Sequence, residues 1–400
     1  MRQKTAFFTI LLIIGFGLNS SIKAQNSKTK PNAKSTINKG AAVSTQNEPA
    51  NLIIITTDGL RWQEVFNGMD SELANHKKFN HGDSAYLHQK YGATTAQGRQ
   101  SKLLPFITAT MGTTGLLFGN RFKNNKVDVA NPHWFSYPGY NEIFTGYPDT
   151  AINSNQYPPN PHENILAFLQ KQKAYQNKVI AFGAWDAYNR ILNEAASGFP
   201  VINGFENLLP ILQDPQTKML AEMLKDSYKP FKEAECLDIF THQQAQYYLE
   251  TKRPKIMYIS YGETDEWAHE GNYSAYLDAA HQVDAWVASI WNWVQRTPGY
   301  KDNTYLLITT DHGRGFGEAW TDHGADVQGA SSIWFGLMGP AKNSKLESIA
   351  KSVAESSNGT PSMGEQRNQQ QLYQKQLAAT MAKLLDLNFT AAHPIGAAIY

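Results

Sequence analysis

Three apolar runs in this chain each lead into acidic residues, and histidines accompany two of them. Residues 51–57 (NLIIITT) run into Asp58, residues 253–261 (RPKIMYISY) are followed by Asp265 and His269, and residues 304–310 (TYLLITT) run into Asp311 and His312. The length and β-branched content of these runs are typical of buried parallel strands. Open α/β sheets bind ligands at the carboxyl ends of their strands. We therefore expect these side chains to meet at one edge of a parallel sheet.

Each pattern has a simpler explanation when it is taken alone. An Asp-Gly pair after a strand is common in turns, and Asp265 and His269, four residues apart, could form an ordinary pair on a helix surface. Independent turns are not expected to repeat the pattern after three runs. A mixture of carboxylate and imidazole groups suits zinc and similar divalent ions. The sequence therefore predicts a metal site.

These stretches resemble the alkaline phosphatase superfamily. Residues 58–61 (DGLR) resemble the first metal motif of its nucleotide pyrophosphatase/phosphodiesterase branch, and residues 311–313 (DHG) resemble a later one. Asp265 and His269 match the family's Asp-x-x-x-His pattern. Ser136 stands in the nucleophile position, because Tyr137, Pro138 and a later Thr-Gly pair follow it as they do in that branch.

The resemblance implies an alkaline phosphatase-like α/β fold with two divalent metal ions, zinc being expected and manganese the alternative. One ion would be held by Asp265, His269 and His323, and the other by Asp58, Ser136, Asp311 and His312. A serine hydroxyl needs activation, and a divalent cation makes its alkoxide accessible. The expected function is a phosphomonoesterase or phosphodiesterase that acts on a small-molecule phosphate ester through a phosphoserine intermediate.

Two further residues are candidates for contacts with the phosphate. The phosphodiesterase branch places an Asn some twenty residues after the nucleophile; Asn155 is the best match, and Asn153 is its rival. Arg314 could also reach a phosphate. As one charge in a turn, however, it is expected to face solvent.

The chain departs from the phosphodiesterase pattern at the last histidine. His323 follows His312 closely, as in cofactor-independent phosphoglycerate mutases, whereas phosphodiesterases usually place this ligand far downstream. His393 and His281 are the competing candidates. Ser136 also begins a stretch that resembles the sulfatase signature, although Tyr140 stands where sulfatases carry Arg. Sulfatases hold one calcium ion with carboxylates and an amide, so the histidines argue against that branch.

Three alternatives to a phosphoric ester hydrolase remain. Two are enzymes, a mutase-like phosphotransferase and a sulfatase-like hydrolase. The third is a secreted binding protein whose metals are structural. The hydroxyl of Ser136 argues against this last alternative, because a closed structural zinc site has no use for it.

The N-terminus predicts export to the periplasm or the cell exterior. A basic start, an apolar stretch from Ala6 to Leu18 and a small residue at Ala24 are typical of a signal peptide spanning residues 1–24. A polar, disordered linker (25–49) and one metallohydrolase domain (50–400) are expected to follow. No membrane span is expected after cleavage. A net charge of +1 gives no reason to expect a nucleic-acid partner. The sequence does not indicate the oligomeric state.

The remaining chain alternates between helical and strand-like patterns. Helices are expected at residues 162–170, 275–295 and 369–385, and strands at 178–183 and 332–338. This alternation predicts a mainly parallel sheet covered by helices on both faces. Residues 186–250 carry little strand pattern and are expected to form a helical insertion over the site, with residues 185–190 as candidates for substrate contacts. The single cysteine, Cys236, excludes an internal disulfide and is expected to be buried.

Overall fold

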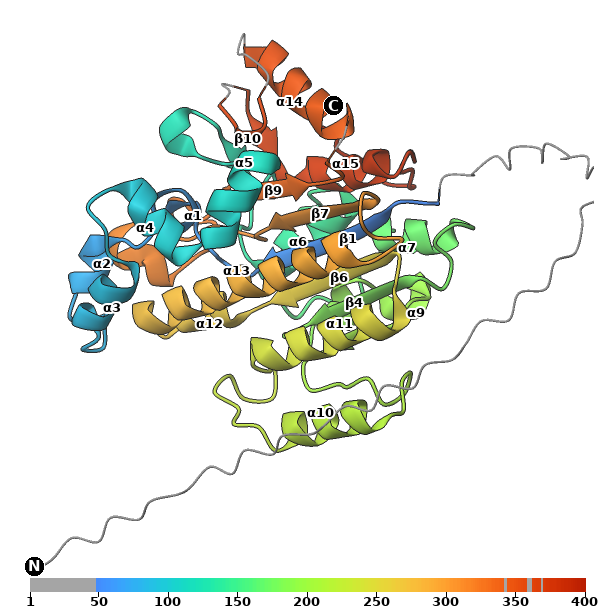
Figure 1. The fold of residues 1–400 in the computed structure, drawn as a ribbon, viewed down its shortest axis with the longest axis horizontal. Coiled ribbons are helices and arrows are strands. Elements are labelled where there is room, and N and C mark those ends of the chain that lie inside the picture. The colour runs from blue at the N-terminus through green and yellow to red at the C-terminus, as the bar shows by residue number, and fades with distance from the viewer. Residues whose placement is uncertain (1–47, 342–343, 358–361, 368–369) are drawn as a thin grey trace, which may run out of the picture. The chain divides into compact units, whose positions relative to one another are not determined.

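The central sheet is built around β1 (Asn51–Thr57), every residue of which is buried. In this computed structural model, which describes residues 48–341, 344–357, 362–367 and 370–400, β1 lies between β6 (Ile256–Tyr261) and β7 (Thr304–Thr309). Both neighbours pair with it in parallel. The three strands that lead into the Asp and His residues are therefore adjacent, and their carboxyl ends share one edge (Figure 1).

The whole sheet has eight strands in the order β10-β2-β9-β7-β1-β6-β4-β5. Its other members are β4 (Val179–Gly183), β5 (Val201–Asn203), β9 (Phe335–Met338), β2 (Leu116–Phe118) and β10 (Gly364–Glu365). Among the described strands of this sheet, β9 alone runs antiparallel to its neighbours, β7 and β2. A second, small sheet has the order β11-β3-β8, formed by Leu372–Tyr373, Val127–Asp128 and Ser332–Ile333. The prediction of a mainly parallel sheet is confirmed.

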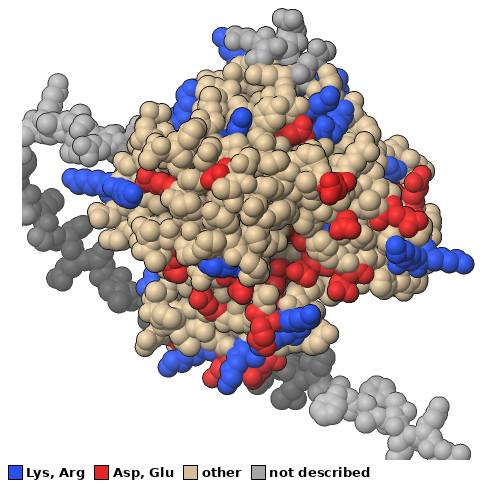
Figure 2. All heavy atoms as spheres, turned by 180° about the vertical axis from the view of Figure 1, so that it is seen from behind, with Lys and Arg blue, Asp and Glu red and all other residues tan. Residues whose placement is uncertain are grey.

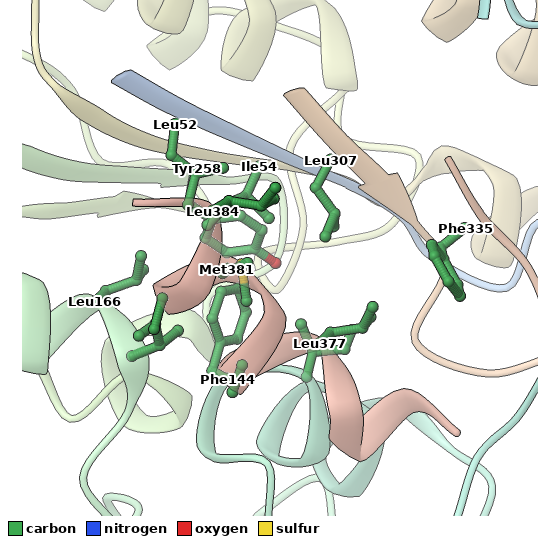
Figure 3. Close-up of a cluster of buried hydrophobic side chains, with 14 of the residues drawn as sticks. Leu52, Ile54, Phe144, Leu166, Tyr258, Leu307, Phe335, Leu377, Met381 and Leu384 are labelled. Atoms are coloured by element: carbon green, nitrogen blue, oxygen red, sulfur yellow. The ribbon is translucent and has the colours of Figure 1, made fainter. Parts of the chain in front are cut away.

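Helices cover both faces of the large sheet, as predicted. Alternate residues of β1 point to opposite faces, so Leu52 and Ile54 belong to one hydrophobic core while Ile53 and Ile55 belong to the other. The first core is closed by α6 (Ser136–Thr145), α7 (Ile165–Lys171), α14 (Ser344–Ser357) and α15 (Leu377–Leu384). Figure 3 shows Leu377 and Met381 of α15 beneath the strands of this face. The second core is closed by α1 (Trp62–Asn67), α4 (Ala96–Leu103), α11 (Asp238–Lys252) and α13 (Tyr273–Arg296).

The other helices lie largely in the connections. They are α2 (Ser71–Asn75), α3 (Ser84–Tyr91), α5 (Gly112–Thr114), α8 (Tyr188–Ile191), α9 (Glu194–Ser197), α10 (Pro215–Lys225) and α12 (Glu263–His269). A π-helical turn, η1, spans Ile107–Met111, and 3-10 turns span Arg121–Lys123 (η2), Gly317–Thr321 (η3) and Gln374–Gln376 (η4). The helices predicted at 162–170 and 275–295 correspond to α7 and α13, and the strand predicted at 178–183 corresponds to β4.

Three predicted elements need correction. The strand expected at 332–338 is two strands, because β8 pairs in the small sheet and β9 in the large one. The helix expected at 369–385 begins only at Leu377, since β11 and η4 precede it. Residues 186–250 are not purely a helical insertion. They contain β5, an edge strand of the large sheet, and α11, whose Ala245 and Leu249 pack into the core. In Figure 1, α10 lies outside the sheet layers.

The predicted signal peptide and all but the last two residues of the predicted linker lie outside the described residues. Within the part that is described, no helix is both long and apolar enough to cross a bilayer. Cys236 is buried, with 1% of its surface exposed, as the sequence predicts.

Candidate metal centre

Asp58 and Gly59 form the turn that follows β1. The backbone NH of Asp58 donates to Tyr261 O (2.8 Å), which extends the pairing of β1 with β6, and the NH of Gly59 donates to Asp311 Oδ1 (3.1 Å). Gly59 has a φ of +58°, and a Cβ there would lie 2.6 Å from Asp265 Oδ1. Only glycine therefore allows the ends of β1, β6 and β7 to approach so closely.

His312 lies at the centre of the buried acidic groups. Its Nε2 is 3.2 Å from Asp58 Oδ1, 3.3 Å from Asp311 Oδ2 and 3.8 Å from Asp265 Oδ1. Its other ring nitrogen, Nδ1, lies 2.9 Å from the carbonyl oxygen of Gly313, which can only accept a hydrogen bond. Nδ1 therefore carries the proton, and the lone pair of Nε2 faces the carboxylates.

The groups around His312 offer acceptor atoms to a cation. Burial lowers the pKa of His312 to about 4, so the ring is neutral near pH 7. Asp58 Oδ1 and Asp311 Oδ2 are buried and have no hydrogen-bond partner among the described residues. Burial, reinforced by nearby carboxylates, raises the pKa of Asp58 and of Asp311 well above the usual range. A lone pair and two carboxylate oxygens that face one another form a donor set suited to a divalent cation.

A second group of candidate ligands converges beside the first. Asp265 and His269 are four residues apart on α12, and His269 Nε2 lies 3.0 Å from Asp265 Oδ2. His323 comes from the loop after η3, and its Nε2 is 2.9 Å from His269 Nε2 and 3.7 Å from Asp265 Oδ1. Ligand atoms of Asp265, His312 and His323 all lie within 4.8 Å of one another, as do those of Asp58, Asp311 and His312. The two groups share His312, so the two candidate positions are adjacent.

The pKa shifts differ between the two groups. Although burial opposes it, the charges of Arg314 and His269 hold the pKa of Asp265 well below its usual range. The Asp265 carboxylate raises the pKa of His269. Burial, together with the neighbouring His312, lowers the pKa of His323 well below its usual value. His323 is therefore neutral, as a metal-binding imidazole must be.

The competing histidines are elsewhere in the fold. His393 Nε2 lies 3.0 Å from Glu163 O, and its ring packs against His162 and Tyr147. His281 Nδ1 lies 2.7 Å from Leu103 O and packs against Tyr91. Neither is near the converging carboxylates, whereas His323 is among them.

Ser136 is the first residue of α6 and faces the first group. Its Oγ is 3.5 Å from His312 Nε2, and the residue is 6% exposed. Gly139 allows this approach, because a Cβ there would lie 2.4 Å from the carbonyl oxygen of Asp311. The helix therefore packs directly on the turn after β7. A hydroxyl beside a buried candidate metal-binding group is the arrangement that a metal-activated nucleophile needs.

The side chain of Asn155, which belongs to the chain segment after α6, contacts the beginning of that helix. Its Oδ1 accepts a hydrogen bond from the backbone NH of Tyr137 (3.0 Å). The side-chain nitrogen of Asn155 makes no hydrogen bond with any described residue, which leaves a donor next to Ser136. Arg190 holds this loop by donating to Asn155 O (3.3 Å) and Tyr157 O (2.8 Å). Asn153, the rival candidate, is exposed.

The expectation that Arg314 faces solvent is wrong. The residue is 1% exposed, and its guanidinium pairs with Asp265 Oδ1 and lies 3.3 Å from His269 Nδ1. Its Nε donates to Trp320 O (2.8 Å). The loop from Arg314 to His323 folds back over the end of β7, and this buries the guanidinium group of Arg314.

Two other residues of the site were not predicted from the sequence. Tyr140 donates through its hydroxyl to Asp58 Oδ2 (2.9 Å) and so orients that carboxylate from α6. Glu235 is a buried carboxylate, and Asp58 and Asp265 are among the acids that raise its pKa. Tyr140 could have been suspected, since it lies one helical turn after Ser136. No local pattern marks Glu235.

Comparison with known proteins gives a family and a fold. The family model described as Sulfatase matches residues 50–386. Three similar solved structures are the alkaline phosphatase PafA, the lipoteichoic acid synthase LtaP from Listeria monocytogenes and BT1596, a 2-O GAG sulfatase. Their sequence identities are 11%, 12% and 13%, with TM-scores of 0.53, 0.50 and 0.50. The alignments cover 88%, 85% and 86% of this chain, and 98%, 72% and 72% of theirs. No curated protein sequence matched the chain.

Proposed function

Because this chain belongs to the sulfatase family of the alkaline phosphatase superfamily, we propose that it is a two-metal hydrolase of phosphoric esters with Ser136 as its nucleophile. The observation that carries the proposal is the environment of His312 Nε2. It faces two carboxylates at 3.2 and 3.3 Å and the Ser136 hydroxyl at 3.5 Å. Histidine and carboxylate ligands favour zinc or manganese, whereas calcium prefers oxygen ligands alone.

The proposed ligand sets follow the two groups of side chains. Asp265, His269 and His323 would hold one ion. Asp58, Asp311 and His312, with Ser136 Oγ, would hold the other. When bound, the ions lower the pKa of a coordinated hydroxyl and stabilise the charge that develops on the attacking and leaving oxygens.

The protein's own residues then have distinct tasks. Ser136 Oγ, as an alkoxide, forms a bond to phosphorus while the bond between phosphorus and the ester oxygen breaks. Water subsequently breaks the bond between phosphorus and Ser136, which releases phosphate or a monoester. The side-chain NH₂ of Asn155 donates to a non-bridging oxygen, and Tyr140 keeps Asp58 oriented throughout.

Sulfate ester hydrolysis is the second candidate, and the family model favours it. Two features favour phosphate. Tyr140 occupies the position of the Arg in the sulfatase signature, and its hydroxyl is committed to Asp58. The histidines of the site are also a poor match for a single calcium ion.

The decisive experiment compares hydrolysis of an aryl phosphate, a bis-aryl phosphate and an aryl sulfate by the zinc-loaded protein. We expect turnover of the phosphates to exceed that of the sulfate. Ser136→Ala should lower kcat by about a thousandfold or more with little change in metal content. The exposed serine of α2, changed in Ser71→Ala, is the matched control. Preferred hydrolysis of the sulfate, or substantial activity of Ser136→Ala, would refute the proposal.

We also propose that the protein is exported and cut near Ala24, which rests on the sequence of residues 1–24. The N-terminal residue of protein recovered from the periplasm or medium tests this. An intact Met1 would contradict it.

A further inference from the structure

The two candidate metal positions differ in charge. They are the Asp58 position, formed by Asp58, Asp311 and His312, and the Asp265 position, formed by Asp265, His269 and His323. Within the described part of the chain, the ion-pair contacts of Asp58 and Asp311 are with the neutral ring of His312 alone. Asp265 instead pairs with the guanidinium of Arg314, which is always charged. A cation would therefore meet two uncompensated carboxylates at the Asp58 position, but at the Asp265 position one carboxylate that is already paired with a positive charge.

The guanidinium of Arg314 is fixed against Asp265. Its Nε donates to Trp320 O (2.8 Å), and its two terminal nitrogens donate to Thr321 O and to Asp265 Oδ1. On the face that Figure 2 shows, most Lys and Arg side chains lie toward the edge, where solvent screens their charges. Arg314, by contrast, is 1% exposed. A divalent ion at the Asp265 position would therefore lie close to a fixed and poorly screened positive charge.

The second ring nitrogen of His269 leads to the same conclusion. An imidazole that binds a metal through one nitrogen normally donates the proton of the other nitrogen to an acceptor. His312 has such an acceptor, since its Nδ1 lies 2.9 Å from Gly313 O. His269 Nδ1 instead lies 3.3 Å from a terminal nitrogen of Arg314, which can only donate. A metal bound to Nε2 of a neutral His269 would place the proton on Nδ1, where it would face another donor.

From these contacts we propose that Arg314 competes with the metal ion for Asp265 and His269, so that the Asp265 position binds a divalent ion less tightly than the Asp58 position. The proposal rests on the proposed function, since it takes the two groups of side chains as metal positions. At a low concentration of free metal the protein would hold one ion, and hydrolysis would follow the occupancy of the weaker position. Arg314 would thus set the concentration of free metal at which the enzyme becomes active.

The loop that carries His323 does not depend on Arg314 alone. Trp320 in this loop is fully buried and packs against three other buried aromatic rings, whose centroids lie 5.1, 5.3 and 5.7 Å from its own. The backbone NH of Gly315 also donates to Asp322 O (3.0 Å), which closes the loop just before His323. A variant without the guanidinium should therefore keep His323 in place and change mainly the charge beside the metal.

Titration of the chelated protein with zinc, in competition with a chromophoric chelator, tests the order of binding without an activity assay. The native protein should bind two ions with Kd values that differ by at least about a hundredfold. His323→Ala should lose only the weaker step, whereas Asp58→Asn should weaken the tighter one. These three measurements do not require that a variant of Arg314 folds.

The role of Arg314 itself is tested by two replacements of similar length. Arg314→Met removes the charge and should lower the Kd of the weaker step at least about tenfold. Arg314→Lys keeps the charge and should leave this Kd close to the native value. Arg121→Met is the matched control, because Arg121 is a partly buried arginine that pairs with Asp128 outside both positions.

Several outcomes would overturn the inference. Equal Kd values in the native protein, or loss of the tighter step in His323→Ala, would show that the order of the two positions is wrong. An Arg314→Met protein that binds its second ion no more tightly than the native protein would show that the guanidinium does not compete. If the zinc-loaded native protein still hydrolyses the aryl phosphate, this inference alone fails. A protein that binds no zinc and hydrolyses no phosphate ester would refute the proposed function as well.

Discussion

At the scale of single residues, the site is defined by nitrogen and oxygen atoms that face one another and that a cation could bind. The neutral Nε2 of His312 faces Asp58 and Asp311, and the Nε2 atoms of His269 and His323 are 2.9 Å apart. In the first case a cation would replace repulsion between acceptors with coordination, and in the second it would replace the hydrogen bond between the two imidazoles. The metal ions should therefore contribute to the order of these side chains as well as to chemistry.

The assignment of His323 as the third ligand of its group is the residue-scale prediction that discriminates best. His323→Ala should lower the metal content from about two ions per chain toward one, and activity by orders of magnitude, because a catalytic zinc needs its three protein ligands. Elemental analysis and the aryl phosphate assay measure the two effects. His393→Ala is the matched control, and we expect it to retain both ions. The reverse pattern would make His393 the ligand.

At the scale of elements, α6 sets the distance between the nucleophile and the strand ends. Alanine normally stabilises a helix interior relative to glycine by about 1 kcal/mol. At Gly139 the opposite should hold, because the new Cβ would lie 2.4 Å from the backbone of Asp311. Relieving this overlap would move α6 and carry Ser136 away from His312.

Gly139→Ala should therefore lower stability by about 1–3 kcal/mol, the usual cost of overpacking, and reduce kcat more than KM. Thermal unfolding and steady-state kinetics on the same preparation measure both. A Gly139→Ala protein with unchanged Tm and full activity would mean that α6 does not depend on this contact.

The same elements show how much the sequence alone could predict. The runs ending at Thr57, Tyr261 and Thr310 are recognisable because buried parallel strands are continuously apolar, and adjacent parallel strands bring their carboxyl ends together. The strand β5 was missed because three residues at a sheet edge carry little pattern. Glu235 and the burial of Arg314 could not be predicted, since both depend on how a loop folds back over the sheet.

At the scale of the whole molecule, stability and metal binding should be linked through pH. The pKa values of Asp58 and Asp311 are raised in the folded state without metal. A carboxyl group whose folded pKa is raised favours the folded state fully below its unfolded pKa, about 4. That contribution is lost as the pH rises through the folded pKa. As the pH rises toward neutrality, these two groups therefore stabilise the chelated protein less and less. Metal binds best in the same pH range, because its ligands are deprotonated there.

The gap in Tm between metal-loaded and chelated protein should consequently widen between about pH 5 and about pH 8. The raised pKa of His269 acts in the same direction, because its proton must leave before a metal can bind. The variant Asp58→Asn isolates the contribution of the Asp58 carboxylate to the stability of the metal-free protein. Once chelated, this variant should be more stable than the chelated native protein at about pH 8, since it removes a buried charge, yet it should bind metal less tightly. A constant gap across this range, or a chelated Asp58→Asn protein less stable than the native one, would show that the uncompensated carboxylates do not limit the stability of the metal-free fold.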